Sequence, residues 1–269
     1  MIKKYLNPYL LQNNTFSGET LRQKLIVLDE IGSTNDYLKT QTTNFTPLPE
    51  WSAIMAKHQS QGRGQRGNTW LVEPGKNLTF SFLIYPEFLK LKNQFSLSVW
   101  VSLSLVEWLE NLGIRAQIKW PNDIMISGKK VAGFLIENSS RGETLRQSII
   151  GIGLNINQTK FPQDLSSRVT SVALSTGKTQ NELQEMCLSL LSHLQQNFTT
   201  FKEQMESSGE LLRAYNKRLY RRGIWAPFRS IADGDLEGRI ESVNADGDLS
   251  LRHRNGAISQ YRFKEIQYL

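Results

Sequence analysis

The sequence lacks several features that would place a protein in a specialised class. It contains a single cysteine, Cys187, which excludes an internal disulfide framework and a cysteine-rich zinc site. Its three histidines lie far apart in the chain, so they do not favour a histidine metal site. No apolar run approaches the length of a membrane-spanning helix. The first 14 residues also lack the apolar core of a signal peptide, and we therefore expect a cytoplasmic protein.

What the chain does contain is typical of a globular protein. Its 269 residues are 39% hydrophobic and 21% charged, enough for one large domain with a smaller one attached. The formal net charge of +7 favours an anionic partner without selecting one. Nucleic acid, a nucleotide and an acidic protein all fit this charge.

Residues 61–70, QGRGQRGNTW, stand out because they combine three glycines with two arginines and little apolar content. Glycine lets a ligand approach the backbone closely, and arginine supplies fixed donors for carboxylate or phosphate. We interpret this segment as a flexible loop that binds an anion. A solvated basic loop without a ligand is the alternative.

The same loop also spells the dinucleotide-binding pattern Gly62-x-Gly64-x-x-Gly67, with Glu87 about twenty residues further on. That pattern requires a helix directly after the loop, because the helix N-terminus holds the pyrophosphate. Here residues 78–85 form the next regular pattern, and they are typical of a strand. No helix fits between loop and strand, so the sequence disfavours this interpretation.

Alternating and helical apolar patterns predict the other elements. Residues 1–24 are polar and predict an irregular arm, and Ser33 with Asp36 has the spacing of a helix capping box. The serines and glycines around residues 127–128 predict a hairpin over 124–137 that carries Lys129 and Lys130 at its tip. Further strands are expected at 25–31, 52–57, 114–119 and 149–155, and helices at 96–112, 179–206 and 210–220.

Two segments carry more specific information. The long helical stripe that includes Cys187 places this thiol in the core, which makes a nucleophilic role unlikely for it. Gly151 and Gly153 lie on one face of the strand at 149–155, which indicates close approach of a ligand or tight internal packing. Near the end, Asp233-Gly234, Asp246-Gly247 and Asn255-Gly256 are strong turn dipeptides, so a small β-barrel is expected there.

Five segments in order resemble the landmarks of the biotin protein ligase family. They are STN at 33–35, GRGQRGNTW at 62–70, KWPND at 119–123, KVAGFLIE at 130–137 and GIGLN at 151–155. The resemblance implies an α+β fold, with a mixed β-sheet flanked by helices as in class II aminoacyl-tRNA synthetases and a small C-terminal SH3-like β-barrel. It also implies an N-terminal arm at 1–24, a catalytic domain at 25–222 and an SH3-like domain at 223–269.

The activity that this resemblance implies is that of a biotin–[acetyl-CoA-carboxylase] ligase. ATP activates the biotin carboxylate as biotinyl-5′-AMP, and a lysine of a biotin carboxyl carrier protein then attacks it. Because carboxylate and polyphosphate repel each other, cations must bring them together. The resemblance assigns this role to Lys130, Arg63, Arg66 and Lys119, and spacing alone does not choose Lys130 over Lys129.

The binding residues follow from the same resemblance. Biotin is expected to contact Ser33, Thr34, Asn35, Gln59, Gly62, Arg63, Gly64, Trp70, Lys130, Gly133, Leu135, Gly151 and Gly153. ATP is expected to contact Arg63, Arg66, Trp70, Lys119, Asn122, Asp123, Lys130 and Asn155. Asp123 is also expected to help place Mg²⁺ with the ATP phosphates. For Trp70, an ordinary core position is the alternative.

The sequence departs from the family pattern in two places. Gln65 and Asn68 stand where many members carry arginine, so we expect a less tightly held adenylate, with Arg63, Arg66, Lys119 and Lys130 binding the phosphates. The arm at 1–24 is too short for the DNA-binding winged helix of some members, so no sequence-specific DNA binding is expected; a salt-resistant, sequence-specific gel shift would overturn this.

Two other functions remain open at this point. A lipoate-protein ligase shares the expected fold and adenylate chemistry, although the KWPND and GRGQRGNTW segments favour biotin. A basic nucleic-acid-binding protein is the alternative from another class, and the mixture of arginines and aromatics at 249–263 supports it only weakly. No membrane partner is expected, and either a monomer or a homodimer is compatible with the sequence.

Overall fold

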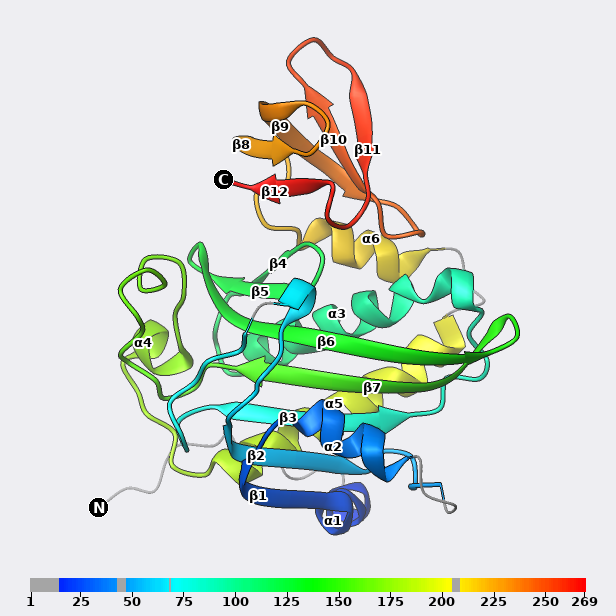
Figure 1. The fold of residues 1–269 in the computed structure, drawn as a ribbon, viewed down its shortest axis with the longest axis vertical. Helices are drawn as coiled ribbons and strands as arrows, with labels where there is room; N and C mark the ends of the chain where they lie inside the picture. Colours follow the sequence, from blue (N-terminus) through cyan, green and yellow to red (C-terminus); the bar gives the residue numbers. More distant parts are fainter. Residues whose placement is uncertain (1–14, 43–46, 68, 205–208) are drawn as a thin grey trace.

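Two sheets form the framework of the protein in the computed structural model, which describes residues 15–42, 47–67, 69–204 and 209–269. A seven-stranded sheet lies below a five-stranded sheet formed by the end of the chain (Figure 1). Helices flank the larger sheet, and the smaller sheet is SH3-like. The predicted α+β class is therefore confirmed.

The larger sheet has the strand order β1-β2-β3-β7-β6-β5-β4. β1 and β2 are parallel and all the other neighbours are antiparallel, so the sheet is mixed. Its strands are β1 (Leu25–Ile31), β2 (Ala53–Gln59), β3 (Leu78–Ile84), β4 (Gln117–Lys119), β5 (Asp123–Ile126), β6 (Lys129–Arg141) and β7 (Thr144–Leu154).

Strand β3 shows how the sequence divides the two faces of this sheet. Leu78, Phe80, Phe82 and Ile84 belong to the main core, whereas Leu83 packs in a second cluster with Leu38. Successive side chains of a strand point to opposite faces, so the even positions face one layer and the odd positions the other. Helices α3 (Phe95–Asn111) and α5 (Leu183–Gln204) cover the core face, and α2 (Thr34–Gln41) lies on the opposite face (Figure 1).

The expectation of an irregular arm up to residue 24 is wrong for its second part. Residues 15–24 form helix α1 (Thr15–Lys24), and residues 1–14 lie outside the described residues. Leu21 is only 2% exposed, and Arg22 forms an ion pair with Glu185 of α5 at 2.7 Å. Tertiary packing therefore stabilises a segment whose polar composition gave no helical signal.

Three predicted elements have different bounds because nearby residues bind their backbones. α5 begins at Leu183 and not at Thr179, since the backbone of Gln180 hydrogen-bonds in both directions with the Asn157 side chain. The predicted helical residues 205 and 206 lie outside the described residues.

α6 (Glu210–Lys217) ends before residue 220, and β4 is shorter than 114–119. Ile118 pairs with the backbones of Arg218 and Tyr220, which ends α6, and the N–H of Ile114 donates to the carbonyl of Leu109 in α3, which keeps Ile114 out of β4.

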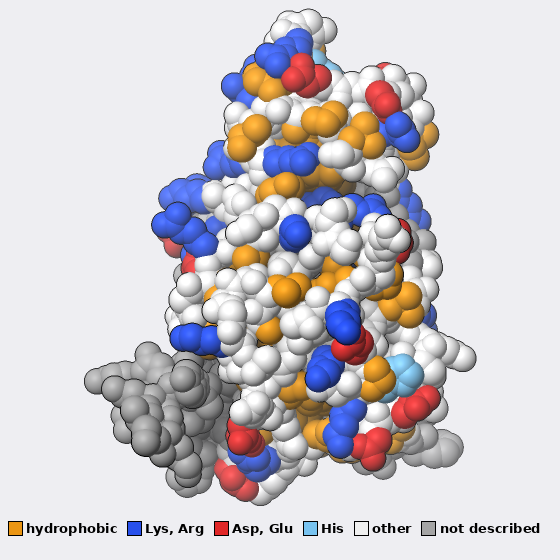
Figure 2. Space-filling view, turned by 90° about the vertical axis from the view of Figure 1, so that its left-hand side faces the viewer, with side chains coloured by type: hydrophobic (Ala, Val, Ile, Leu, Met, Phe, Trp, Pro, Cys, Tyr) orange, Lys and Arg blue, Asp and Glu red, His pale blue; other side chains and the backbone are white. Residues whose placement is uncertain are grey.

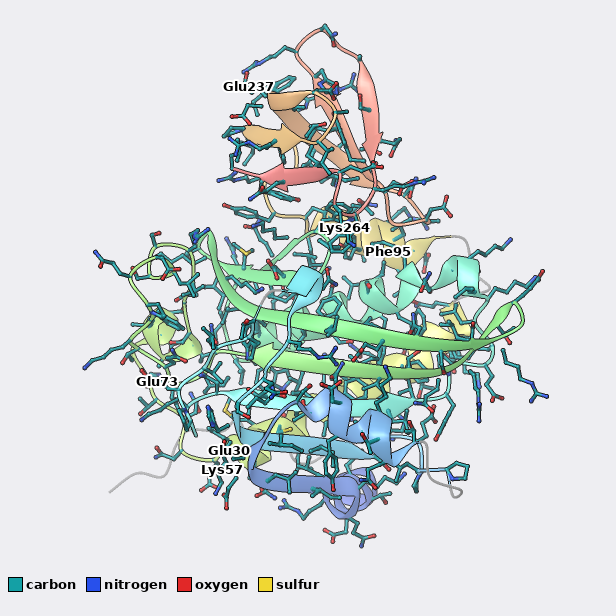
Figure 3. The ribbon with its side chains drawn as sticks, in the orientation of Figure 1. Glu30, Lys57, Glu73, Phe95, Glu237 and Lys264 are labelled. Atoms are coloured by element: carbon teal, nitrogen blue, oxygen red, sulfur yellow. The ribbon has the colours of Figure 1, made fainter. Side chains whose placement is uncertain are left out.

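The smaller sheet has the order β11-β10-β9-β8-β12. Its turns contain Gly234, Gly247 and Gly256, all with positive φ, as the turn dipeptides predicted. Trp120 donates from Nε1 to the carbonyl of Gly247 at 2.9 Å, and Phe95 packs against the same glycine at the junction of the sheets (Figure 3). The strands are β8 (Trp225–Ser230), β9 (Gly234–Val243), β10 (Leu249–His253), β11 (Ile258–Tyr261) and β12 (Ile266–Tyr268).

The remaining elements are short, namely α4 (Val172–Thr176) and the 3-10 turns η2 (Gln65–Gly67) and η3 (Leu91–Asn93). The predicted hairpin turns at Ser127 and Gly128, and Lys129 and Lys130 begin β6 immediately after it. Among the described helices, none has both the length and the apolarity needed to cross a membrane.

Candidate active site

A cavity of about 830 Å³ lies between the larger sheet, the loop at 61–70 and the end of the smaller sheet. All five sequence motifs contribute residues to its wall. Of the predicted site residues with described side chains, Gly62 alone does not line it. The Arg66 side chain and Asn68 lie outside the described part of the chain. On the face shown in Figure 2, Lys and Arg side chains predominate over Asp and Glu across the middle of the molecule.

The first part of the wall is the N-terminus of α2. Ser33 caps this helix, since its Oγ accepts from the backbone N–H of Asp36, as the capping-box spacing predicted. Thr34 donates from its backbone N–H and from Oγ1 to Gln59 Oε1, at 2.7 and 2.9 Å. Both Thr34 and Gln59 are buried, so the local backbone and these hydrogen bonds fix their positions.

Asn35 joins three strands of the sheet. Its Nδ2 donates to Glu137 Oε2 at 2.7 Å, and its Oδ1 accepts from Ser81 Oγ at 2.6 Å. A Cβ on Gly151 would lie 2.2 Å from Asn35 Oδ1, so only glycine leaves room for this amide. The bare surface at Gly151 is thus explained, at least in part, by internal packing, and the expected biotin contact of Asn35 remains a prediction.

The glycine-rich loop follows β2, and its described residues form the 3-10 turn η2. The next regular element after η2 is the strand β3, as the sequence predicted. Arg63 Nη2 forms ion pairs with Asp36 of α2 and with Glu137 of β6, the latter at 3.3 Å. In this arrangement the Arg63 guanidinium is held by two carboxylates of the protein itself.

Trp70 ends the loop and lies against Gly153 of β7. A Cβ on Gly153 would come within 2.2 Å of Trp70 Cε2, so the glycine makes room for the indole ring. Lys130 Nζ lies 5.6 Å from the centroid of the same ring. The indole N–H is buried and has no hydrogen-bond partner within the described residues, which leaves it available to an acceptor in the cavity.

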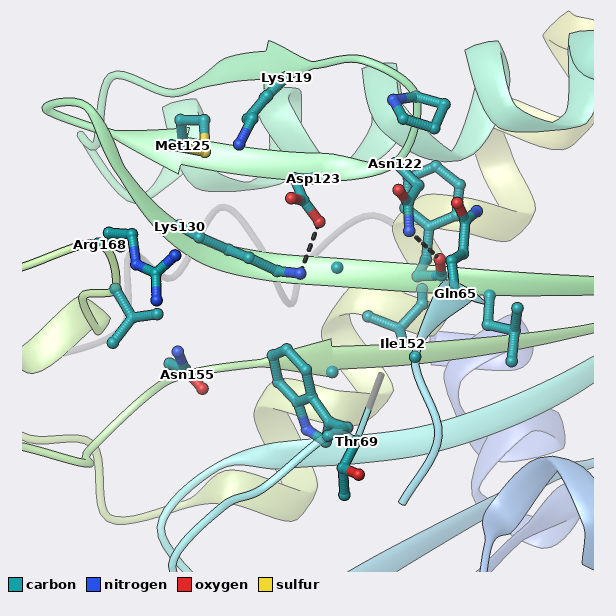
Figure 4. A pocket seen from close by; sticks show the side chains of 18 of the residues that line it. Gln65, Thr69, Lys119, Asn122, Asp123, Met125, Lys130, Ile152, Asn155 and Arg168 are labelled. Carbon is teal, nitrogen blue, oxygen red and sulfur yellow. Dashed lines mark hydrogen bonds and ion pairs between the residues drawn. The ribbon is translucent and has the colours of Figure 1, made fainter. Parts of the chain in front are cut away.

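Lys130 and Asp123 form an ion pair across the hairpin, with 2.6 Å between Nζ and Oδ1 (Figure 4). A Cβ on Gly133 would lie 3.0 Å from Lys130 Nζ and 3.3 Å from Asp123 Oδ1, so glycine at this position allows the pair to form. Lys119 lies near them on β4, and burial lowers the pKa of its amine although Asp123 partly opposes this. The structure thus brings together three charged residues from two motifs.

The two asparagines that were assigned to ATP hold the backbone in this structure. Asn122 Nδ2 donates to the carbonyl of Phe134 at 2.7 Å, and Asn155 Nδ2 donates to that of Thr170 at 3.0 Å. The backbone N–H of Asn155 also donates to Val131. Both residues therefore shape the cavity, and their contacts with ATP remain predictions.

Several residues of the site were not identified from the sequence. Ser81 and Glu137 hold Asn35, and Arg168, Arg221 and Tyr268 line the cavity. Ser81 lies on the polar side of β3, where strand alternation offered a signal, and Glu137 ends the quoted KVAGFLIE segment. Nothing in the local sequence marks Arg168 or Tyr268, and Arg221 stands out only as one member of a basic cluster with Arg213, Lys217, Arg218 and Arg222.

Within the described residues, no group of three or more His, Cys, Asp or Glu side chains could hold a metal ion. Asp123 is the only acidic side chain in the wall of the cavity, and one of its oxygens is paired with Lys130. These residues do not fit a resident metal. They fit Mg²⁺ only as an ion that phosphate oxygens also hold.

Comparison with known proteins agrees with this geometry. Residues 27–155, which include all five motifs, match the model of the Biotin/lipoate A/B protein ligase family. In structure, the chain resembles the biotin protein ligase from Aquifex aeolicus in complex with biotin and ATP, with a TM-score of 0.74 and 29% identity. That similarity covers 91% of this chain and 99% of the other. The chain is thus similar, in sequence over 27–155 and in structure over most of its length, to members of this family.

Curated relatives in the same family are similar over part of their length. The bifunctional ligase/repressor BirA of Bacillus spizizenii is 34% identical over 163 residues, which are 60% of this chain and 49% of the relative. The biotin–[acetyl-CoA-carboxylase] ligase of Paracoccus denitrificans is 35% identical over 106 residues, 38% of this chain and 43% of the relative. The chain thus spans about half or less of the length of these ligases.

Proposed function

We propose that this protein ligates biotin to a lysine of a carrier protein by way of biotinyl-5′-AMP. The observation that carries the proposal is the placement of Lys130, which is paired with Asp123 and lies beside Trp70 in a cavity formed by all five motifs. An ammonium group in this position can meet a carboxylate and a phosphate at the same time.

The biotin end of the cavity is formed by the start of α2 and by β2. Gln59 Oε1 already accepts two hydrogen bonds from Thr34, so its NH₂ group is the one that a ligand carbonyl would meet. Ser33 Oγ accepts from the backbone N–H of Asp36 and keeps its proton for a ligand acceptor, whereas the Thr34 hydroxyl already donates to Gln59 and accepts from Ser81. This set of donors and acceptors suits the ureido ring of biotin, and Trp70 would cover the apolar part of the ligand.

In the first step a carboxylate oxygen of biotin attacks the α-phosphorus of ATP. The new O–P bond forms as the bond to the bridging oxygen breaks, and pyrophosphate leaves with that electron pair. Lys130 would contact both the carboxylate and the α-phosphate, and Lys119 would add positive charge nearby. This charge stabilises the transition state more than the separated anions.

In the second step the neutral amine of the carrier lysine attacks the carbonyl carbon of biotinyl-5′-AMP. A new amide bond forms, the bond between carbonyl carbon and phosphate oxygen breaks, and AMP leaves. The amine loses one proton in this step. Magnesium would be held by Asp123 together with phosphate oxygens, and when bound it neutralises polyphosphate charge.

A lipoate-protein ligase is the nearest alternative, because one family model covers both classes. Side-by-side adenylation assays with biotin and lipoate distinguish them. The structure gives less support to nucleic-acid binding, since many arginines of the smaller sheet form ion pairs within it. These pairs are Arg229 with Asp235, Arg239 and Arg252 with Glu241, and Arg254 with Glu237.

The proposal extends to the organisation and surroundings of the enzyme. Residues 25–222 would form the catalytic unit and residues 223–269 a second unit that closes one end of the cavity. The carrier would be a biotin carboxyl carrier protein domain, encountered in the cytoplasm. We retain either a monomer or a homodimer as the working state.

Calorimetry with biotin tests the proposal most directly. Binding with an affinity no better than millimolar would sink it. In a carrier biotinylation assay, Lys130→Ala is expected to lose at least about a hundredfold in rate, because a charged contact in the transition state is removed. The matched control is Lys129→Ala, one residue earlier at the exposed start of β6, which should retain nearly full activity. Normal biotinylation by Lys130→Ala would contradict the assigned role.

A further inference from the structure

The charges in the wall of the cavity are strongly unbalanced. Among the described residues, Asp123 is the only acidic side chain there, and the cations are Arg63, Lys119, Lys130, Arg168 and Arg221. Arg63 is neutralised by Asp36 and Glu137, and Lys130 by Asp123. Arg221 meets the main-chain oxygen of Leu269, the last residue of the chain, and the side chains of Lys119 and Arg168 form no ion pair within the described residues. A concave site with this excess of positive charge is suited to a polyanion.

Arg168 is fixed next to Lys130 by the backbone. The N–H of Lys130 donates to the carbonyl of Arg168, and the N–H of Thr170 donates to the carbonyl of Lys130, both at 2.8 Å. Arg168 is thus placed at the same end of the cavity as Lys130 and Asn155 (Figure 4). Its side chain is exposed, and its single hydrogen bond within the described residues runs from Nη2 to the carbonyl of Asp164.

Arg221 reaches the cavity from the connection between the two sheets. Its φ of +58° is unusual for a residue with a side chain, so the surrounding structure must hold this conformation. Nε donates to Tyr220 Oη and Nη1 donates to the main-chain oxygen of Leu269, a carboxylate oxygen at the end of this chain, each at 3.1 Å. Nη2 makes no hydrogen bond within the described residues. Arg221 is therefore oriented by two contacts and keeps a charged group for a ligand.

The cations of this cluster also affect one another. Burial is the main cause that lowers the pKa of Lys119, and the charges of Lys130, Arg221 and Arg168 lower it further. Repulsion between them is a cost of the ligand-free state that a bound anion would relieve. A single carboxylate, such as that of biotin, carries too little charge to balance this excess of cations. A diphosphate or triphosphate carries enough.

We propose that Arg168 and Arg221 bind the β- and γ-phosphates of ATP, the part that leaves as pyrophosphate. This inference rests on the proposed function, because it takes Lys130 as the residue that meets the α-phosphate. Since the backbone ties Arg168 to Lys130, a phosphate chain that reaches Lys130 lies within reach of a long guanidinium side chain. The glycine-rich loop has the neutral Gln65 at its centre. The two arginines would supply the positive charge that the loop lacks at this position.

Calorimetry on the full chain with magnesium pyrophosphate, ATP and biotin tests the assignment. Arg168→Gln and Arg221→Gln are each expected to weaken pyrophosphate and ATP binding about tenfold, because each variant loses one charged hydrogen bond to the ligand. Biotin affinity should stay within about twofold. Arg222→Gln is the matched control, because Arg222 donates to the carbonyl of Glu241 and does not line the cavity. It should leave the affinities for all three ligands unchanged.

The outcomes separate this inference from the proposed function. Unchanged pyrophosphate affinity in both variants, or no pyrophosphate binding by the wild type, overturns the inference alone if biotin still binds. Failure of the wild type to bind biotin overturns the proposed function. Arg221 also makes structural contacts, so Arg221→Lys is included; it keeps the charge and should retain most of the pyrophosphate affinity. If the Arg221→Gln variant unfolds, the pyrophosphate affinity of Arg168→Gln decides the test, because Arg168 is exposed and its replacement should leave the fold intact.

Discussion

Lys119 Nζ lies 5.0 Å from the centroid of the Tyr268 ring, in a contact that joins β4 of the larger sheet to β12 of the smaller one. Burial between the sheets lowers the pKa of this amine, and the nearby carboxylate of Asp123 compensates only in part. The protein thus has a lysine at a position where burial disfavours the charged form of its amine. Such a cost is expected at a functional position and not at a purely structural one.

The first prediction concerns the stability of Lys119→Met. Because the native pKa of Lys119 is lowered, the native state binds this proton less tightly than the unfolded state, and at pH 7 this difference makes wild type less stable than the variant. The cost falls as pH rises through the lowered native pKa, and it vanishes above the unfolded pKa of about 10.4, where both states are neutral. Urea unfolding at several pH values measures this difference. Lys129→Met, at an exposed position, should change stability by less than about 0.5 kcal/mol. A Lys119→Met variant less stable at pH 7 would refute the argument.

The second prediction concerns the contact between Trp70 and Gly153. Gly153→Ala places a Cβ where the indole ring lies, so Trp70 must move. Overpacking of this kind costs about 1–3 kcal/mol, and we expect biotin binding to weaken about tenfold or more. Calorimetry measures the affinity. The control is Gly32→Ala, where the nearest atom would be 3.7 Å away. Equal biotin affinities for the two variants would show that the glycine is not needed for this packing.

The third prediction concerns the charge of the glycine-rich loop. Gln65 lines the cavity, and its Oε1 is buried without a hydrogen-bond partner within the described residues. The double variant Gln65→Arg, Asn68→Arg adds two donors for phosphate, so release of biotinyl-5′-AMP should slow about tenfold. Release can be followed by trapping free adenylate after a single turnover. If release is not slowed, the loop does not limit retention of the adenylate in this protein.

The fourth prediction concerns the mobility of the loop at 61–70. Arg63 and Glu137 are paired, but among the described residues between β2 and β3 the regular structure is limited to the 3-10 turn η2. Its glycines make ordering costly, so we expect amide exchange in this loop to slow about tenfold on addition of biotin and ATP. Peptides from α5 provide an internal control. Equal protection of the loop with and without ligands would reject ligand-induced ordering.

The fifth prediction concerns the single thiol. Cys187 is fully buried in α5, and burial raises the pKa of its thiol well above the ordinary value. Since the thiolate is the reactive species, a disulfide reagent should react at pH 8 at least about a hundredfold more slowly with native protein than with unfolded protein. Retention of full ligase activity by Cys187→Ala would agree with a purely structural role. Rapid modification of the native state would show that the helix opens readily.

The sequence was informative where local rules decide the outcome. The apolar stripes of α3 and α5 and the alternation in β3 predicted these elements, because periodicity reflects which face is buried. The capping role of Ser33 and the glycine turns of the smaller sheet were likewise predicted, since they depend on a few neighbouring residues. The order of five motifs also pointed to the family whose model matches residues 27–155.

Elements that depend on distant partners could not be predicted in this way. Helix α1 forms because Leu21 is buried and Arg22 pairs with Glu185 across more than 160 residues. The start of α5 depends on Asn157, and the end of α6 depends on Ile118. No local pattern contains these contacts, so propensity and capping signals placed the boundaries incorrectly.

For the site, the sequence by itself determined which kinds of residue are present: cationic lysines, a carboxylate beside them, and glycines on one strand. Only the tertiary structure decided their partners. It paired Lys130 with Asp123 and Arg63 with Glu137, used Asn155 to hold the backbone, and brought Arg168 and Arg221 into the same cavity. The reason is physical: charges act through space over a few ångströms, and only folding sets those distances.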